Sequence, residues 1–391
     1  DQDLPERRHY NQAVLLEVHR PLDPSLLSIV IARLLGRHDA LRLRFVKNES
    51  EWEQSFAPTG DSLPFIVIDI SAAPGVEQTM SIESAAGAMQ STLDLSNGPL
   101  IRFALFNLGA GRPGRLLIIA HHLTIDAVSW RILLEDMQTA YEQLERGDPL
   151  KLPEKTSSFK RWGERLTESA QSAELRQEAD FWYERPHNCE SQLPVDYPGG
   201  ENTEASAGAV LSSLTAEETQ SLLQEAPALY RTQINDALMM ALAQSVTQWT
   251  GERTLLVDLE GHGREELFED IDLSRTVGWF SALFPIRLDM DEFADPGAAL
   301  MAIKEQLREI PNRGIGYGML RYLSRDPEVR EKLSAAPHAE ITFNYFGQLD
   351  HFLSEASHFK PAQESLGRVF DLKGKRSHLL EVNAGVTEGR L

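Results

Sequence analysis

Two stretches of the chain show the spacing of apolar residues that is typical of an amphipathic helix. Leucine, isoleucine and valine recur at this spacing over Pro24–Arg37, where Asp23 is a candidate N-cap and Gly36 a candidate stop. Residues 129–144 repeat the pattern. Strand-like segments lie between and beside these helices, at residues 40–45, 63–70, 100–108 and 115–122. The last two flank the glycine-rich GAGRPG and predict a hairpin.

The second half of the chain follows a segment with the composition of a surface linker, residues 146–158. The pattern then predicts a polar helix at 159–184, a loop to about 208, helices at 216–224 and 234–250, and strands at 254–261 and 339–347. We therefore divide the chain into an N-terminal lobe (1–155), a connecting helix and loop (156–209) and a C-terminal lobe (210–391). The fold class is α/β (α+β), because both lobes mix helices with strands, and the chemistry is expected at their junction.

Composition narrows the class of protein. The 391 residues include 59 acidic and 38 basic ones, a net charge of −21, which disfavours nucleic acid and other polyphosphate ligands. Cys189 is the single cysteine, so an internal disulfide framework and multi-cysteine zinc modules are excluded and a reducing, cytoplasmic location is expected. No apolar run approaches the roughly 18 residues of a membrane helix. The first residues carry neither an initiator Met nor a signal peptide, so we expect a longer parent chain or a missing start.

Several common catalytic motifs are absent or out of context. GAGRPG matches G-x-G-x-x-G formally, but Pro113 and another strand follow it instead of the helix that dinucleotide binding requires. Neither a phosphate-binding loop of the G-x-x-x-x-G-K-[ST] type nor a G-x-S-x-G elbow occurs. Cys189 is interpreted as an incidental thiol, because nothing near it in sequence argues for a lowered pKa.

The segment HHLTIDAVSW lies where an apolar strand gives way to a helix. Adjacent strand residues point to opposite faces, so only one of His121 and His122 can face a given cavity. A lone histidine near a core is usually structural, but Asp126, four residues after His122, can orient a ring or brace the loop. Zinc or iron binding is a weaker alternative, because the paired histidines cannot both reach one ion on a regular strand.

A second candidate acid follows an apolar strand of the C-terminal lobe. Glu260 ends this strand and the glycines of EGHGRE come next, so the backbone can approach a ligand closely; a turn with a solvated glutamate is the alternative. In SRTVGWFSALFP, Arg275 can pair with a buried acid while Trp279 and Phe280 wall a pocket.

Two further strings complete the candidate chemistry. PNRGIGYG is a glycine-dense loop of the kind that lines a channel. In ITFNYFGQ, Asn344 and Tyr345 are expected on opposite faces of a strand unless the strand bulges.

Together these strings resemble a known family. The chain is similar to the epimerization domains of nonribosomal peptide synthetases, within the condensation-domain superfamily, from HYNQA near the start to SHLLEVNAGVTEGRL at the end. The His-His-x-x-x-Asp string is shared with condensation domains, whereas EGHGRE and RTVGWF are selective for the epimerising branch. The resemblance implies two chloramphenicol-acetyltransferase-like lobes in a V with a tunnel between them. Ala127 departs from the family, where many members have Gly.

The resemblance also implies a reaction: inversion of Cα in an aminoacyl or peptidyl thioester, delivered on the phosphopantetheine of a peptidyl carrier protein domain. No cofactor or metal is expected on the domain itself, and carrier and neighbouring synthetase modules are the expected partners. Such an inversion needs two acid/base groups, one for each face of Cα. By this resemblance, His122 and Glu260 are the acid/base pair, and Tyr345, Asn344 or backbone N–H groups stabilise the oxyanion. Asp126 and Arg275 form a structural pair, and His121 belongs to the scaffold. The residues expected to line the tunnel are Ala127, Ser129, Trp279, Phe280 and Gly316.

Two other functions remain open at this point. A condensation-type transferase that forms a peptide bond is favoured by the shared histidine string and disfavoured by EGHGRE. A non-catalytic carrier-binding module is expected to lose His122 or Glu260, and both are present.

Overall fold

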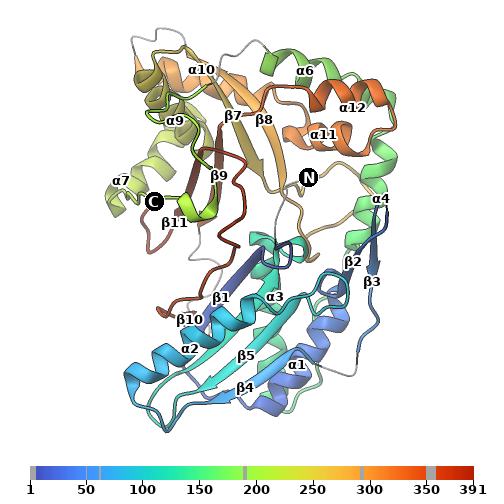
Figure 1. The fold of residues 1–391 in the computed structure, drawn as a ribbon, viewed down its shortest axis with the longest axis vertical. Helices are drawn as coiled ribbons and strands as arrows, with labels where there is room; N and C mark the ends of the chain where they lie inside the picture. Colours follow the sequence, from blue (N-terminus) through green and yellow to red (C-terminus); the bar gives the residue numbers. More distant parts are fainter. Residues whose placement is uncertain (1–5, 50, 61–62, 188–191, 291–294, 349–357) are drawn as a thin grey trace.

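The computed structural model describes residues 6–49, 51–60, 63–187, 192–290, 295–348 and 358–391. The chain forms two lobes, each built on a mixed β-sheet with helices packed against it (Figure 1). Cys189 lies outside the described residues. Among the described residues, no helix combines the length and the apolar character that a membrane span requires.

The first lobe is built on a five-stranded sheet of order β10-β1-β6-β5-β4. The strands are β1 (Asn11–Val18), β4 (Phe65–Asp69), β5 (Ile101–Asn107), β6 (Gly114–His121) and β10 (Phe359–Pro361). Helices α1 (Pro24–Arg37) and α3 (Ala127–Glu145) share a core with one face of this sheet, and α2 (Gly75–Gln90) packs on the other. Because both faces of β6 are covered, its residues form the apolar run LLIIA.

The second lobe is built on a four-stranded sheet of order β11-β9-β7-β8. Its strands are β7 (Thr254–Gly261), β8 (Ala282–Asp289), β9 (Ile341–Gln348) and β11 (Leu380–Val386). Its helices and the helices that lead into it are α4 (Phe159–Ser169), α5 (Ala173–Arg176), α6 (Ala179–His187), α7 (Ala216–Gln220), α8 (Ala226–Tyr230), α9 (Ile234–Thr250), α10 (Pro296–Arg308), α11 (Ile315–Gly318) and α12 (Pro327–Ser334). A separate hairpin of β2 (Leu43–Lys47) and β3 (Trp52–Phe56) reaches from the first lobe towards α4 (Figure 1).

The structure confirms the α+β class in two lobes and most of the expected elements. The predicted hairpin is the antiparallel pair β5–β6. Helix α3 begins two residues earlier than expected, because Asp126 caps it by accepting from the Ser129 N–H. The continuous helix expected at 159–184 is wrong: the chain breaks into α4, α5 and α6, and Ser172 caps the second of these.

The division of the chain into lobes is less simple than the sequence suggests. β10, from the range assigned to the C-terminal lobe, pairs antiparallel with β1 in the first sheet. Helix α2 escaped the sequence analysis because alanine, glycine and serine dominate its second half, which weakens the apolar pattern. The C-terminal segment thus crosses the junction and ties the two lobes together.

Candidate active site

The two histidines at the end of β6 have different surroundings. His121 is 2% exposed; its Nε2–H donates to the Arg7 carbonyl at 2.9 Å, and its Nδ1 accepts from the Leu123 N–H at 3.2 Å. Burial lowers the pKa of His121 to about 4. Both ring nitrogens are occupied by backbone groups, which matches the scaffold role expected for this residue.

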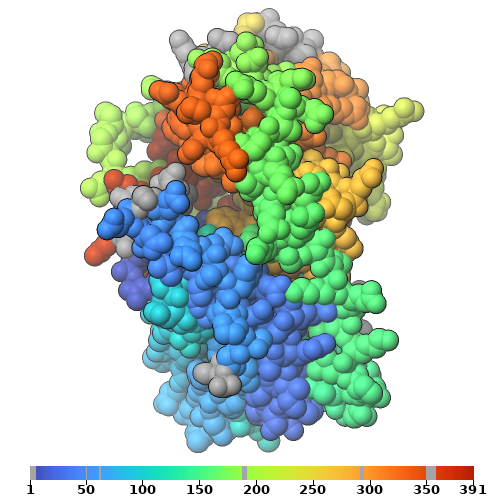
Figure 2. Space-filling model, turned by 90° about the vertical axis from the view of Figure 1, so that its right-hand side faces the viewer, coloured from blue at the N-terminus to red at the C-terminus, as the bar shows by residue number. Residues whose placement is uncertain are grey.

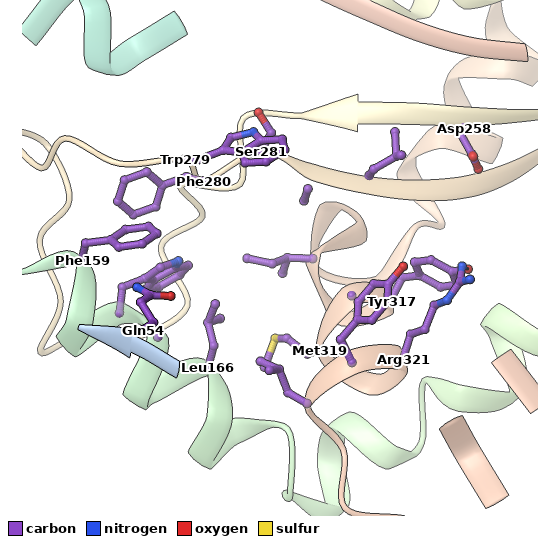
Figure 3. A pocket seen from close by; sticks show the side chains of 18 of the residues that line it. Gln54, Phe159, Leu166, Asp258, Trp279, Phe280, Ser281, Tyr317, Met319 and Arg321 are labelled. Carbon is purple, nitrogen blue, oxygen red and sulfur yellow. The ribbon is translucent and has the colours of Figure 1, made fainter. Parts of the chain in front are cut away.

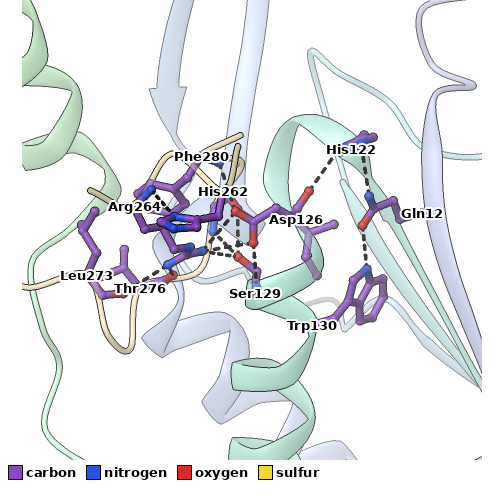
Figure 4. A network of polar contacts seen from close by, with 12 residues as sticks. Gln12, His122, Asp126, Ser129, Trp130, His262, Arg264, Leu273, Thr276 and Phe280 are labelled. Atoms are coloured by element: carbon purple, nitrogen blue, oxygen red, sulfur yellow. Dashed lines mark hydrogen bonds and ion pairs between the residues drawn. The ribbon is translucent and has the colours of Figure 1, made fainter. Parts of the chain in front are cut away.

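His122 opens the 3₁₀ turn that follows β6, and its contacts fix its proton. Its Nδ1 lies 3.1 Å from the Ile125 carbonyl, an acceptor only, so Nδ1 carries the hydrogen. Its Nε2 lies 3.1 Å from the amide nitrogen of Gln12 (Figure 4). Trp130 Nε1, a donor only, bonds Gln12 Oε1 at 2.8 Å and so orients the amide. Nε2 of His122 is therefore an unprotonated acceptor, and burial lowers the pKa of His122.

Aromatic rings from both lobes enclose His122. Tyr10 stacks on it at a centroid distance of 5.2 Å and an interplanar angle of 16°, and Trp279 lies at 4.3 Å. Burial raises the pKa of Tyr10 to about 12, with the charge of Glu260 as the second cause. Tyr10 thus contacts His122, and the charge of Glu260 acts on its hydroxyl.

Glu260 lies near the end of β7, where its charge contributes to the raised pKa of Tyr10. Asn344, on the parallel neighbour β9, donates an amide N–H to Glu260 Oε2 at 2.8 Å. Burial raises the pKa of Glu260; a hydrogen bond from Ser281 acts in the opposite direction, and the charge of Asp126 adds to the rise. A carboxyl in this position can hold a proton at a higher pH than an exposed one.

Tyr345 and Asn344 lie on opposite faces of β9, as alternation predicts. Asn344 faces Glu260, whereas Tyr345 packs with Phe343 against the core of the second lobe. The irregularity in register falls after the pair Ala384–Tyr345, so it does not change this assignment. The structure therefore does not bring Tyr345 to Glu260, and it gives Asn344 a carboxylate partner instead of a free oxyanion position.

The predicted pair of Asp126 with Arg275 is wrong. Asp126 instead pairs with Arg264, whose Nη2 lies 3.1 Å from Oδ1 and 3.2 Å from Oδ2 (Figure 4). The same nitrogen donates to Ser129 Oγ at 2.9 Å, and the guanidinium carbon lies 3.9 Å from the ring centroid of Phe280. Asp126 also accepts from the Phe280 N–H at 3.1 Å, so it joins the histidine loop to the second lobe.

Arg275 contacts helix α3 further from its N-terminus than Arg264 does. It pairs with Glu135 at 2.6 Å and with Asp136, and Asp136 also accepts from Arg37 and His38. The two acids lie nine and ten residues beyond Asp126, about 14 Å along α3 at 1.5 Å per residue. Arg275 is thus too far along α3 to reach Asp126. Arg264 follows the end of β7 and lies beside Asp126.

A cavity of about 970 Å³ lies beside this site, and neither His122 nor Glu260 belongs to its lining (Figure 3). Trp279 and Phe280 lie in its wall, as expected for the tunnel. Ala127, Ser129 and Gly316 do not belong to its lining. Ser129 Oγ instead bonds the Gly278 backbone at 2.8 and 3.0 Å, and a Cβ at Gly316 would collide with Glu178 Oε2.

Sequence reasoning missed three residues at the site: Tyr10, Gln12 and Arg264. The strand pattern could have indicated the first two. Tyr10 and Gln12 are two positions apart at the start of β1, so their side chains point to the same face, and β1 pairs with the strand that ends in His121. Among the described residues, no group of three or more His, Cys, Asp or Glu side chains is arranged to hold a metal ion.

Comparison with known proteins supports one class. A profile of the condensation-domain family matches residues 1–391. One component of the linear gramicidin synthase of Brevibacillus parabrevis is 48% identical over 392 residues, 100% of this chain, and chondramide synthase cmdD of Chondromyces crocatus is 43% identical over 395 residues. The chain spans 5% and 10% of the lengths of these two proteins.

Solved structures agree with this class. The epimerization domain from the third module of tyrocidine synthetase B, TycB3(E), is 32% identical, with a TM-score of 0.91 over 99% of this chain and 86% of that one. The X-domain from teicoplanin biosynthesis shares the fold, at 19% identity and a TM-score of 0.72 over 95% of this chain and 80% of that one. The two-lobed fold and its histidine loop thus define a condensation-type domain. This chain belongs to the condensation-domain family, and within it resembles an epimerization domain.

Proposed function

We propose that this domain epimerises Cα of an aminoacyl or peptidyl thioester that is tethered to a carrier protein by phosphopantetheine. The observation that carries the proposal is that Tyr10 stacks on His122 of one lobe while the charge of Glu260, from the other lobe, acts on the Tyr10 hydroxyl. Their proton states are complementary: Nε2 of His122 is unprotonated, while burial favours the protonated carboxyl of Glu260. One group thus has a free lone pair for a proton, and the other keeps its proton to a higher pH than an exposed glutamate does.

The reaction follows from these two states. The lone pair of His122 Nε2 exchanges its bond from the Gln12 amide for the Cα proton, and the electrons of the C–H bond move into an enolate on the thioester oxygen. The Glu260 carboxyl then delivers its proton to the opposite face of Cα, and the enolate collapses to the inverted thioester. In the reverse direction each group takes the other role, so the sum of bound protons is unchanged. Positioned proton transfer of this kind contributes about 10²- to 10⁴-fold to a rate.

The enolate oxygen needs a hydrogen-bond donor, and Trp279 is the candidate that we assign. Its ring lies 4.3 Å from that of His122. Its Nε1–H is one of the buried polar groups of the described residues that have no hydrogen-bond partner. A donor held in place in a water-poor site stabilises developing charge more than it does in water.

The carrier and the neighbouring modules of a synthetase are the proposed partners. This assignment is supported by the relatives, which are far longer than this chain. The single cysteine in 391 residues is consistent with the cytoplasm, where we place the reaction.

The test is hydrogen exchange at Cα in deuterated water. A carrier-bound L-aminoacyl or peptidyl thioester should gain one deuterium at Cα, read by mass spectrometry, while chiral analysis shows a mixture of D and L forms. A condensing transferase would instead leave Cα–H untouched and join the acyl group to a second, acceptor-loaded carrier. A binding module would do neither. Peptide bond formation without exchange would refute the epimerase proposal.

A further inference from the structure

The proposed reaction creates a positive charge on a buried ring. Once His122 has taken the Cα proton, its imidazole becomes an imidazolium, and burial, which lowers the pKa of His122, disfavours this form. The hydrogen bond that Gln12 donates to Nε2 also favours the neutral ring. Groups that bind the imidazolium better than the neutral ring therefore speed the chemical step, because only such differences lower its barrier.

Two aromatic rings in contact with His122 can supply this preference. The ring of Tyr10 stacks on the imidazole, with 5.2 Å between the centroids and 16° between the planes, and the ring of Trp279 lies at 4.3 Å and 34°. Both centroid distances fall within the roughly 6 Å at which the negative face of an aromatic ring attracts a cation. The nearly parallel Tyr10 ring presents its face to the imidazole, so its attraction increases when His122 becomes charged.

Tyr10 is held in this position by segments from both ends of the chain. Its backbone carbonyl accepts from the His122 N–H at 2.9 Å, so the two residues also meet through the main chain. Tyr10 pairs antiparallel with Phe370, whose ring packs on it at 5.2 Å, and the Asn11 N–H donates to the Val369 carbonyl at 2.9 Å. A ring held from two sides keeps its face on His122 without reorganisation during the reaction.

The Tyr10–His122 pair lies outside the lining of the open cavity. That cavity reaches the surface as a hollow between the blue β2–β3 hairpin, the green α4 and the orange segment around α11 (Figure 2). Trp279 belongs to the lining and packs on both rings, whereas Tyr10 and His122 do not belong to it. Away from water, a ring face attracts a cation more strongly than it does at an exposed site.

Other titratable groups also act on His122 or on Tyr10. Asp126, at the cap of α3, favours the imidazolium by its charge, but it is already ion-paired with the second lobe. His121 is neutral near pH 7, because burial lowers its pKa to about 4. Glu260 acts on the hydroxyl of Tyr10, and burial raises the pKa of this hydroxyl to about 12, so Tyr10 stays a neutral phenol. The ring face of Tyr10 is thus a neutral contact that adds to these charges.

We infer that Tyr10 is a positioning residue that stabilises the imidazolium form of His122 through the face of its ring, and that this contact speeds removal of the Cα proton. The inference rests on the proposed function and assigns a further residue to it. A phenyl ring presents the same negative face as a phenol. Tyr10→Phe should therefore keep the contact, whereas Tyr10→Leu should lose it.

NMR titration of ring-labelled histidine tests the contact without any substrate. Tyr10→Leu should lower the pKa of His122 by about 0.4–1.5 pH units, and Tyr10→Phe should leave it unchanged. Phenylalanines with one, three or five fluorines at position 10 keep the shape of the ring but withdraw electrons from its face, so the pKa of His122 should fall stepwise along this series. The same series at Phe181, a half-buried ring of α6 that packs on Trp182, is the matched control and should have no effect.

The rate of Cα exchange in a carrier-bound thioester should follow the same series. We expect kcat/KM to fall by up to about 30-fold in Tyr10→Leu, and the acidic limb of its pH profile to move to lower pH. Damage to the fold alone would lower the rate without moving this limb. The fluorinated rings, which preserve the packing of Tyr10, should give the same graded loss.

The two measurements separate this inference from the proposed reaction. A constant pKa of His122 along the fluorine series would overturn the inference, even in an active epimerase. A stepwise fall in this pKa with unchanged kcat/KM would overturn it as well, because the contact would then not serve the reaction. A stepwise fall together with no Cα exchange from any thioester would overturn only the epimerase proposal and would support the contact between the Tyr10 ring and the imidazolium.

Discussion

The side-chain amide of Gln12 donates a hydrogen bond to Nε2 of His122 and thereby holds the catalytic candidate in one protonation state. Because Trp130 occupies the amide oxygen, Gln12 cannot turn to accept a proton from His122 without losing the bond from the indole N–H. The neutral imidazole is thus stabilised on both sides, by Gln12 at Nε2 and by the Ile125 carbonyl at Nδ1. Position 12 therefore needs a neutral donor and not a charge.

Changing Gln12 to glutamate should raise the pKa of His122. A carboxylate still accepts from Trp130, but it favours a protonated Nε2 by charge and by hydrogen bonding, an effect of about 1–3 pH units at this separation. Less neutral base is then present near pH 7, so the acidic limb of the kcat/KM profile moves to higher pH. NMR titration of ring-labelled histidine measures the pKa directly. Gln143→Glu, at a half-buried position near the end of α3, is the control, and an unchanged His122 titration in Gln12→Glu would contradict the hydrogen-bond assignment.

Replacing Glu260 by glutamine should abolish epimerisation and raise thermal stability at pH values above the pKa of Glu260. The amide keeps an oxygen for the bond from Asn344 but cannot carry the proton, so exchange should fall at least about 10²-fold. Burial raises the pKa of Glu260, so the folded state binds its proton more tightly than the unfolded state does, and wild-type stability falls as pH rises between the two pKa values. The gain in Tm should therefore be largest above the raised pKa of Glu260 and shrink at lower pH as the carboxyl becomes protonated.

Calorimetry at several pH values measures this gain, with Glu218→Gln as a control of opposite sign. Hydrogen bonds from Thr215 lower the pKa of the exposed Glu218, so its removal should not stabilise the protein. Near-normal exchange in the Glu260→Gln variant would show that Glu260 is not the catalytic acid.

Arg264 and Arg275 should differ in their importance for stability. Arg264→Ala leaves Asp126 buried, 4% exposed, without its ionic partner, and the loss of one member of a buried pair costs about 3–5 kcal/mol. Arg275→Ala leaves Asp136 with both Arg37 and His38, so its cost should be smaller. Urea denaturation of the two variants gives the comparison. A larger loss for Arg275→Ala would show that the lobes depend on Asp136 and not on the helix cap.

These arginines show what the sequence could and could not predict. The apolar run of β6, the cap at Asp23 and the alternation of Asn344 and Tyr345 are local properties, and the pattern predicted them correctly. The choice between two arginines eleven positions apart depends on the path of the loop after β7, which no periodicity encodes. The pairing of β10 with β1 is equally non-local, since it joins residues more than 340 positions apart.

Removing only the indole N–H of Trp279 should slow the reaction and leave substrate binding nearly intact. The donor acts on charge that develops in the enolate, so its loss should lower kcat by about 10²- to 10³-fold with little change in KM. Benzothienylalanine at position 279 keeps both rings against His122 and lacks the N–H, whereas Trp279→Phe also shortens the ring. Both should lose exchange to a similar extent if the donor matters, and Trp249→Phe, on the exposed side of α9, should lose none. Full activity with benzothienylalanine would show that Trp279 acts only as a wall of the site, and the enolate oxygen would then need a backbone donor.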